Sequence, residues 1–333
     1  MEVIEKQKYL FDVIKTKINS RIKLVDEIES VLNLSENAAY RRIRGEKELS
    51  FKELLTLCEK YNLSVDEILN FKSRQGALFH YAPVDFSDKK SYIAYIKNLL
   101  GTLNVYKSAK DIEMNISAQD IPFFYILDFP ELMFFKLYAW NDTVTRAPIS
   151  YSEFCGNLDK KTIIPIYKEL ATAWKYIPSI EIWTNQTIDT ILRLIEYYYE
   201  IDAFENKESV LFLLHQLMEV MNIVKKNADS GFKAENMKTP FSLYLCNVDF
   251  ENNFMLIKRG EKMSCTIRLF TVNSIVTDNK DLCVETAKWI DDLISKSFLI
   301  SGTSYRERMR FFHSSKNKIE GLINKIEKNG APG

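Results

Sequence analysis

The sequence contains few of the residues that build metal and catalytic sites. Its three histidines, His80, His215 and His313, have no cysteine, serine or carboxylate at a spacing diagnostic of such a site. Its five cysteines are isolated, without a Cys-x-x-Cys pair, and we interpret them as reduced core residues. A Gly-x-x-x-x-Gly-Lys phosphate loop is also absent. We therefore predict no catalytic residues, no metal and no cofactor, and we expect a protein that is not an enzyme.

The chain also lacks a net charge and a long uncharged run. Its 45 Lys and Arg residues balance 45 Asp and Glu residues, so any attraction to a nucleic acid must come from a local patch. The most apolar segment, residues 121–140, is interrupted by charged residues and by Pro130, and we interpret it as buried helices around a proline break. The N-terminal residues are charged throughout, unlike a signal peptide. We expect a cytoplasmic protein without a membrane segment.

Apolar residues are abundant: 46% of the 333 residues are hydrophobic and 13% are aromatic. This composition indicates a globular chain with a sizeable core and room for two or three domains. We predict a mainly α fold, in which an N-terminal five-helix domain precedes a larger, mostly helical domain with a small antiparallel sheet near the C-terminus. The predicted parts are a first domain at 1–72, a linker at 73–90, a helical dimerisation or sensing domain at 91–230, and an α+β portion at 231–333 with strands at about 242–278 and two closing helices.

The most informative stretch is SENAAYRRIRGEKEL, residues 35–49, which is predicted to form a short helix with a basic face. At the helical period, Ala39 and Ile43 fall on one side, whereas Asn37, Arg41 and Arg44 fall on the other. Asn can contact adenine, Arg can contact guanine, and either can hold a phosphate. The pattern is typical of a helix that lies in a DNA groove, and a solvated helix face is the alternative.

The residues on both sides of this helix favour DNA binding. Upstream, apolar residues repeat at helical spacing over 24–32, and a three-residue connection ends at Ser35, a suitable N-cap. Downstream, Gly45 is placed to end the helix in a left-handed conformation. Two capping boxes then open further apolar runs, Ser50 with Glu53 and Ser64 with Glu67. With an opening helix at about residues 9–18, five short helices are expected within about 70 residues, near the size at which one core is self-supporting.

This pattern resembles the Cro and lambda-repressor type of helix-turn-helix domain, the XRE (xenobiotic-response-element) family of regulators. The resemblance covers about residues 6–71, and its most recognisable part is YRRIRGEKELSFKELLTLCEKYNLSVDEIL. The second helix departs from the family pattern, because Lys23–Glu27 lacks the Gln that members typically carry there. The resemblance implies a DNA-binding transcriptional regulator. The residues expected at the DNA are Asn37, Ala38, Tyr40, Arg41 and Arg44 near the bases, and Arg42, Lys47 and Ser50 at the phosphates.

A second candidate site lies near the C-terminus, where Ser301, Gly302, Thr303 and Ser304 precede a predicted helix that carries Arg306. Free backbone N–H groups and the helix dipole favour an anion at such a position, so a phosphate or carboxylate of an effector is one interpretation. Ordinary N-capping by Ser and Thr is the simpler one.

These patterns together predict a sequence-specific DNA-binding regulator whose partner is double-stranded DNA. We expect a homodimer, because one such domain buries too little DNA surface for tight specific binding. The C-terminal region is expected to dimerise or to sense a small-molecule or peptide effector. Two alternatives stay open: a protein-interaction module without sequence-specific DNA binding, and a nucleotide-acting enzyme in the C-terminal half.

Overall fold

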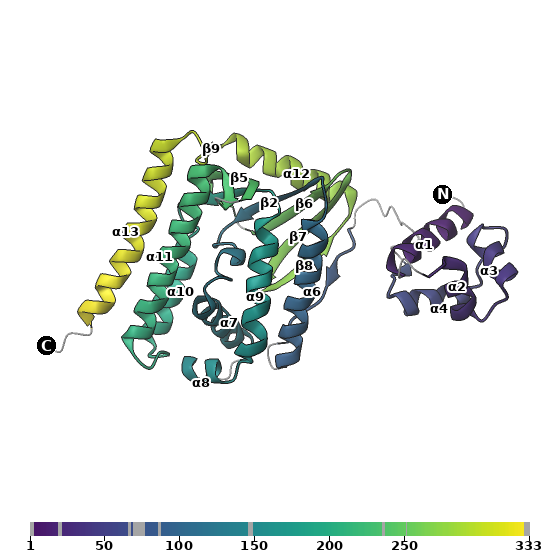
Figure 1. The fold of residues 1–333 in the computed structure, drawn as a ribbon, viewed down its shortest axis with the longest axis horizontal. Helices are drawn as coiled ribbons and strands as arrows, with labels where there is room; N and C mark the ends of the chain where they lie inside the picture. The colour runs from purple at the N-terminus through teal and green to yellow at the C-terminus, as the bar shows by residue number, and fades with distance from the viewer. Residues whose placement is uncertain are drawn as a thin grey trace. The chain divides into compact units, whose positions relative to one another are not determined.

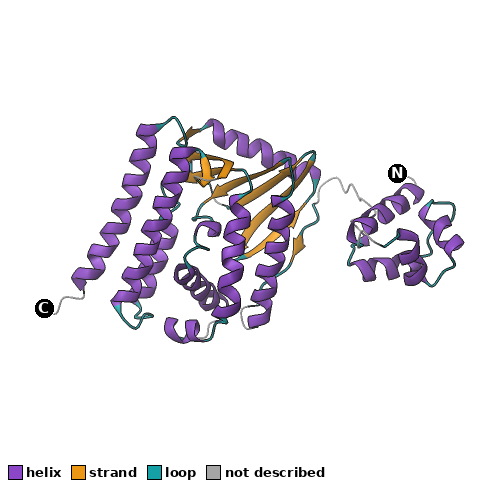
Figure 2. Ribbon diagram, viewed as in Figure 1, coloured by secondary structure: helices purple, strands orange, loops and turns teal. Residues whose placement is uncertain are grey.

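The computed structural model describes residues 3–18, 22–65, 68, 77–85, 88–145, 149–234, 237–250 and 252–329. The chain forms two compact units, residues 1–78 and 79–333. Their elements are drawn in Figure 1 and coloured by type in Figure 2. Each unit has its own hydrophobic core, so each is described by itself.

The N-terminal unit is helical throughout its described elements. These are α1 (Val3–Lys17), α2 (Leu24–Leu32), α3 (Glu36–Ile43) and α4 (Phe51–Tyr61). Apolar residues from all four helices form one core, with Leu10, Ile14 and Ile28 fully buried. The capping box of Ser50 and Glu53 is confirmed at the start of α4. The predicted fifth helix lies largely outside the described residues, as does Glu67 of the second capping box.

The C-terminal unit is built on a mixed sheet. Its strands are β1 (His80–Tyr81), β2 (Ile112–Ala118), β3 (Ser179–Thr184), β4 (Phe232–Ala234), β5 (Met237–Cys246), β6 (Phe254–Arg259), β7 (Lys262–Phe270), β8 (Asn273–Thr277) and β9 (Ser297–Leu299). Their order is β1-β8-β7-β6-β2-β3-β5-β4, and β9 pairs with β5. The central strands β2, β3 and β5 are parallel, whereas β6, β7 and β8 form an antiparallel meander beside β2.

The predicted fold class, with a small antiparallel sheet near the C-terminus, is therefore wrong. The nine described strands belong to one sheet and are spread from residue 80 to residue 299. The strands expected at 242–278 are present, but β5 pairs in parallel with β3 and does not pair with β6. The division at residue 230 also does not follow the structure, because β2 and β3 share the sheet with β5 to β8. Two of the missed strands, β2 and β3, are almost wholly buried, so neither shows the alternation of a half-exposed strand.

Helices cover both faces of the sheet. They are α6 (Lys89–Lys107), α7 (Pro130–Thr145), α8 (Tyr151–Gly156), α9 (Lys160–Lys175), α10 (Asp189–Glu200), α11 (Lys207–Ser230), α12 (Lys280–Ser295) and α13 (Tyr305–Asn329), with a 3₁₀ turn, η1, at Phe123–Tyr125. The larger core joins one sheet face to α6, α7, α9, α10 and α11, and α6 lies alongside α9 (Figure 1). On the other face, α12 packs Ile290 and Trp289 against β6 and β7.

The apolar segment 121–140 is buried as predicted, with η1 before the proline and α7 beginning at Pro130. Phe134 and Phe135 are both fully buried. Among the helices of the described residues, none combines the length and apolar character needed to cross a membrane.

Candidate nucleic-acid interface

Helices α2 and α3 form a helix-turn-helix with a tight, well-defined connection. Asn33 ends α2 in the left-handed region (φ 51°), and the backbone N–H of Leu34 donates to the Glu29 carbonyl oxygen at 3.1 Å. Ser35 is extended and occupies the N-cap position of α3, although its hydroxyl makes no capping hydrogen bond within the described residues. Ala39 is completely buried against the core and fixes the rotation of α3. This arrangement leaves the opposite face of α3 outward.

The outward face carries most of the side chains predicted at the DNA. Asn37, Tyr40, Arg41 and Arg44 are exposed, at positions one turn or two turns apart on α3 and its C-cap. The Arg44 guanidinium lies 5.3 Å from the centre of the Tyr40 ring and 3.6 Å from the Glu46 carboxylate. Such exposed contacts contribute little energy, so Arg44 can exchange them for a phosphate or a base.

Arg42 has a different place from the predicted phosphate contact. Its side chain is buried at 9% exposure, and its Nη2 and Nε lie 2.7 and 2.9 Å from Oε1 of Glu53 on α4. Its Nη1 donates to the Ala38 carbonyl oxygen at 3.1 Å. Partial burial acts to raise the pKa of Glu53, but the hydrogen bonds from Arg42 and Ser50 outweigh it and the pKa is lowered. Arg42 therefore joins α3 to α4 and is not available on the outward face.

The loop after α3 is held by Gln7, a residue of α1 that the sequence patterns did not single out. Its Nε2 donates to the carbonyl oxygens of Arg42 at 2.6 Å and Lys47 at 2.9 Å, and its Oε1 accepts from the Leu49 N–H at 2.8 Å. Gln7 is buried on the same helical stripe as Leu10, Phe11 and Ile14, the apolar core side of α1. A polar residue on such a stripe was the available signal, because a buried amide needs partners.

The other predicted DNA residues lie at the edges of this surface. Lys47 is exposed on the loop, and Ala38 is half-buried on α3. Ser50 is exposed but serves the fold: its N–H donates to Oε2 of Glu53 at 2.7 Å, and its Oγ accepts from the Glu53 N–H at 3.3 Å. The exposed basic residues near α3 are thus Arg41, Arg44 and Lys47, and Arg42 is the one that the structure removes from the set.

The predicted anion site at residues 301–304 joins β9 to α13, and many of its polar groups already have partners. The Ser301 hydroxyl accepts from the Leu243 N–H at 3.1 Å, and the Gly302 N–H donates to the Ala228 carbonyl oxygen at 2.8 Å. Buried Arg308 donates to the carbonyl oxygens of Ile300 and Gly302 at 2.9 and 3.1 Å.

These bonds account for the 301–304 loop as a structural junction. Thr303 is exposed, Ser304 is half-buried, and Arg306 is exposed on α13. The arginine that organises the loop is Arg308, which also pairs with Asp229 at 2.5 Å. The sequence patterns gave no signal that separates Arg308 from Arg306.

Comparison of the chain with protein-family models, with curated proteins and with solved structures gives no match. The described residues also contain no group of three or more His, Cys, Asp or Glu side chains placed to hold a metal ion. The candidate interface on α3 therefore rests on its own geometry and chemistry.

Proposed function

We propose that this protein is a sequence-specific DNA-binding transcriptional regulator that acts as a dimer. The observation that carries the proposal is the orientation of α3 about its own axis. Ala39 and Arg42 face inward, whereas Asn37, Arg41 and Arg44 face outward together from a helix that follows a tight turn. An exposed helix of this composition can enter the major groove, where Asn and Arg make bidentate contacts to adenine and guanine.

The charge distribution supports contact through a small patch. Of the four basic residues in 37–47, three (Arg41, Arg44 and Lys47) are exposed beside one acidic residue, Glu46, whereas the chain as a whole is neutral. One patch of this size makes few phosphate contacts, and two copies held about one helical turn of DNA apart would double them. The C-terminal unit is the part of the chain available to dimerise and to bind an effector.

The direct test selects DNA from a pool of random duplexes with the full chain and then measures binding by gel shift at several salt concentrations. The variant Arg41→Ala plus Arg44→Ala should lose specific binding, at about 1–3 kcal/mol for each base contact, and should show a shallower salt dependence. The matched control is Arg306→Ala plus Arg310→Ala, which removes two exposed arginines from α13. Unchanged binding and salt dependence in the Arg41 and Arg44 variant would show that α3 is not the DNA-reading helix.

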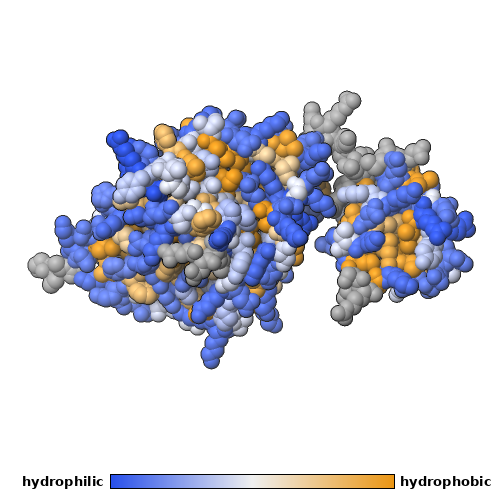
Figure 3. All heavy atoms as spheres, turned by 45° about the horizontal axis from the view of Figure 1, so that its top comes forward, coloured by the Kyte–Doolittle hydropathy of each residue, from blue (hydrophilic) through white to orange (hydrophobic). Residues whose placement is uncertain are grey.

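A protein-interaction module is the second candidate, and exposed apolar residues on α4 favour it. Phe51 is 71% exposed and Leu55, one turn later, is 37% exposed. Hydrophobic side chains also reach the surface of the N-terminal unit in Figure 3. If this candidate is correct, random duplexes should yield no preferred sequence, and Phe51→Ser should abolish capture of a protein partner without changing DNA binding.

A further inference from the structure

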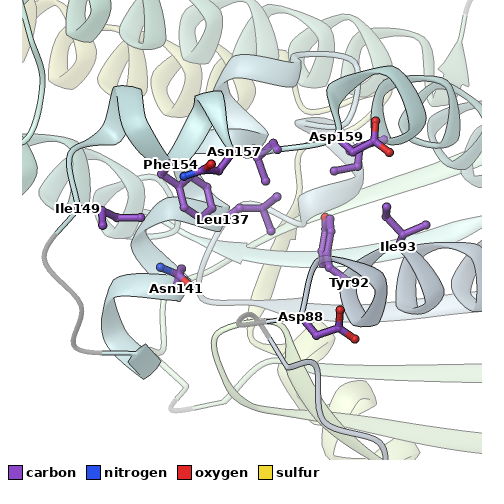
Figure 4. Close-up of a pocket in the computed structure, with 11 residues that line it drawn as sticks. Asp88, Tyr92, Ile93, Leu137, Asn141, Ile149, Phe154, Asn157 and Asp159 are labelled. Carbon is purple, nitrogen blue, oxygen red and sulfur yellow. The ribbon is translucent and has the colours of Figure 1, made fainter.

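A cavity of about 350 Å³ opens in the C-terminal unit between the start of α6, α7, α8 and the start of α9 (Figure 4). Its walls are mainly apolar. The apolar side chains that line it are Ile93, Leu137, Ile149, Phe154, Leu158 and Ile163, with the ring of Tyr92. Leu137 and Ile163 are buried in the main core, so the inner wall belongs to the rigid part of the fold. This volume and lining are in the range of small-molecule sites.

Among the residues that the structure describes, the charged ones that line the cavity are Asp88 and Asp159. Both are exposed, and both are N-caps: Asp88 accepts from the Lys90 N–H at 2.9 Å and Asp159 from the Thr162 N–H at 3.2 Å. In the view of Figure 4, the ring of Tyr92 lies between the two carboxylates.

We propose that this cavity binds a small organic cation with an apolar body, such as a hydrophobic primary amine. The apolar body fits against Leu137, Phe154 and Ile163, and the ammonium group lies at the rim, where it can donate hydrogen bonds to Asp88 or to Asp159. An organic anion would meet two carboxylates at the same rim. A neutral molecule would gain the apolar contacts alone, so the sign of the head group decides the preference.

Binding at this site does not require that the chain bind DNA. Its role as the sensing site of a regulator rests on the function proposed above. Under that function, the ligand would alter DNA affinity only if it binds differently to the DNA-competent and DNA-incompetent states.

The test uses three probes that share a phenyl body and differ in the head group: 2-phenylethylammonium, 2-phenylethanol and 3-phenylpropionate. Isothermal titration calorimetry on the full chain should give the tightest binding for the ammonium probe and the weakest for the carboxylate probe. Asp88→Asn plus Asp159→Asn should lower the affinity for the ammonium probe about tenfold and leave the affinity for the alcohol unchanged. Asn caps a helix about as well as Asp, so these substitutions remove the charge and keep the caps.

Two further variants locate the binding. Ile93→Trp narrows the cavity and should weaken all three probes, whereas the control Asp291→Asn, on α12, should change none of them. Equal affinity for the three head groups, an ammonium preference that survives in the double Asn variant, or no binding of any probe would each overturn the proposal. Gel shifts with and without the ammonium probe distinguish the two proposals. If the chain binds the ammonium probe but not DNA, the cavity proposal stands and the proposed regulator function is wrong. If the chain binds DNA but not the ammonium probe, the regulator function stands and the cavity proposal is wrong.

Discussion

The guanidinium group of Arg42 and the carboxylate of Glu53 lie 2.7 Å apart where α3 meets α4. Arg41, the preceding residue, is exposed on the other side of α3. Of two consecutive arginines in the same basic run, Arg42 is therefore buried against a half-buried acid, whereas Arg41 faces solvent. Substitutions at Arg42 should therefore change the stability of the N-terminal unit, whereas substitutions at Arg41 should change its binding surface and leave stability almost unaltered.

Arg42→Gln should destabilise the N-terminal unit by about 2 kcal/mol, because it leaves a mostly buried carboxylate without its partner. Arg41→Gln removes the same charge from an exposed position and should change stability by less than about 0.5 kcal/mol. Hydrogen exchange of the α3 and α4 amides in the full chain measures both effects. Equal protection in the two variants would mean that the Arg42 and Glu53 pair does not hold α3 to α4.

The pair of Arg42 and Glu53 also predicts that the stability of the N-terminal unit falls at acidic pH. The pKa of Glu53 is lowered below its ordinary value of 4.5 in the folded chain, so the unfolded chain binds more protons as the pH falls. The stabilisation is complete above pH 4.5 and is lost as the pH falls through the lowered folded value. Glu53→Gln should flatten this acid limb in a plot of N-terminal unfolding free energy against pH, and an unchanged limb would contradict the assignment.

Gln7→Leu should destabilise the loop that follows α3. The substitution keeps the size and burial of the side chain but removes the hydrogen bonds to Arg42, Lys47 and Leu49. We expect a loss of about 2 kcal/mol, because backbone groups near the core are left without partners. Lys15→Leu, an exposed change on the same helix, is the control. Loss of amide protection at Leu49 in the Gln7 variant alone would support the role, and equal protection would contradict it.

Gly45→Ala should destabilise the N-terminal unit by more than the left-handed backbone conformation alone explains. Gly45 has φ +75°, and an added Cβ would lie 2.6 Å from Cγ2 of Ile4 on α1. The conformational part is about 1–2 kcal/mol. Gly231→Ala is a matched control, since Gly231 has φ +74° and nothing within 4 Å of the added Cβ in the described structure. Ile4→Ala should recover the steric part of the Gly45→Ala loss, and equal losses at Gly45 and Gly231 would exclude a steric part.

Local signals predicted the N-terminal unit well. The turn at Asn33, the start of α3 at Glu36, the left-handed Gly45 and the capping box at Ser50 all depend on residues close in sequence. The structural roles of Gln7 and Arg42 were not predicted, because their partners are 35 and 11 residues away along the chain. A basic run identifies charge but does not show which arginine a distant acid will bury.

The sheet was missed for a related reason. Strands β2 and β3 are buried and contain polar residues, Asn115 in β2 and Glu181 in β3, at positions that an apolar strand pattern does not allow. Their pairing joins residues more than 60 apart, for example Asn115 with Ile180. Burial of a charge such as Glu181 is specified by the tertiary surroundings, so no local pattern could predict it.

Lys233 and Glu181 are two buried charged residues of the C-terminal unit that interact with each other. Lys233, on β4, is 1% exposed, with its ammonium 3.8 Å from the centre of the Trp174 ring and 3.3 Å from the Trp174 carbonyl oxygen. Glu181 is fully buried, and the donors to its carboxylate are Tyr125 at 3.1 Å, Ser179 at 3.2 Å and Trp183 at 3.1 Å. Burial lowers the pKa of Lys233 to about 7, and the nearby Glu181 carboxylate opposes that shift.

Lys233 should therefore make the C-terminal unit more stable as the pH rises. Between pH 7 and the ordinary lysine value of 10.5, the unfolded chain keeps a proton that the folded chain has released. The free energy of unfolding then rises with pH, by up to about 1.4 kcal/mol per unit. Lys233→Met should remove this rise, whereas Lys238→Met, at an exposed position on β5, should leave it intact. Urea unfolding across this pH range measures the slope. A slope that persists in Lys233→Met would show that another group releases the proton.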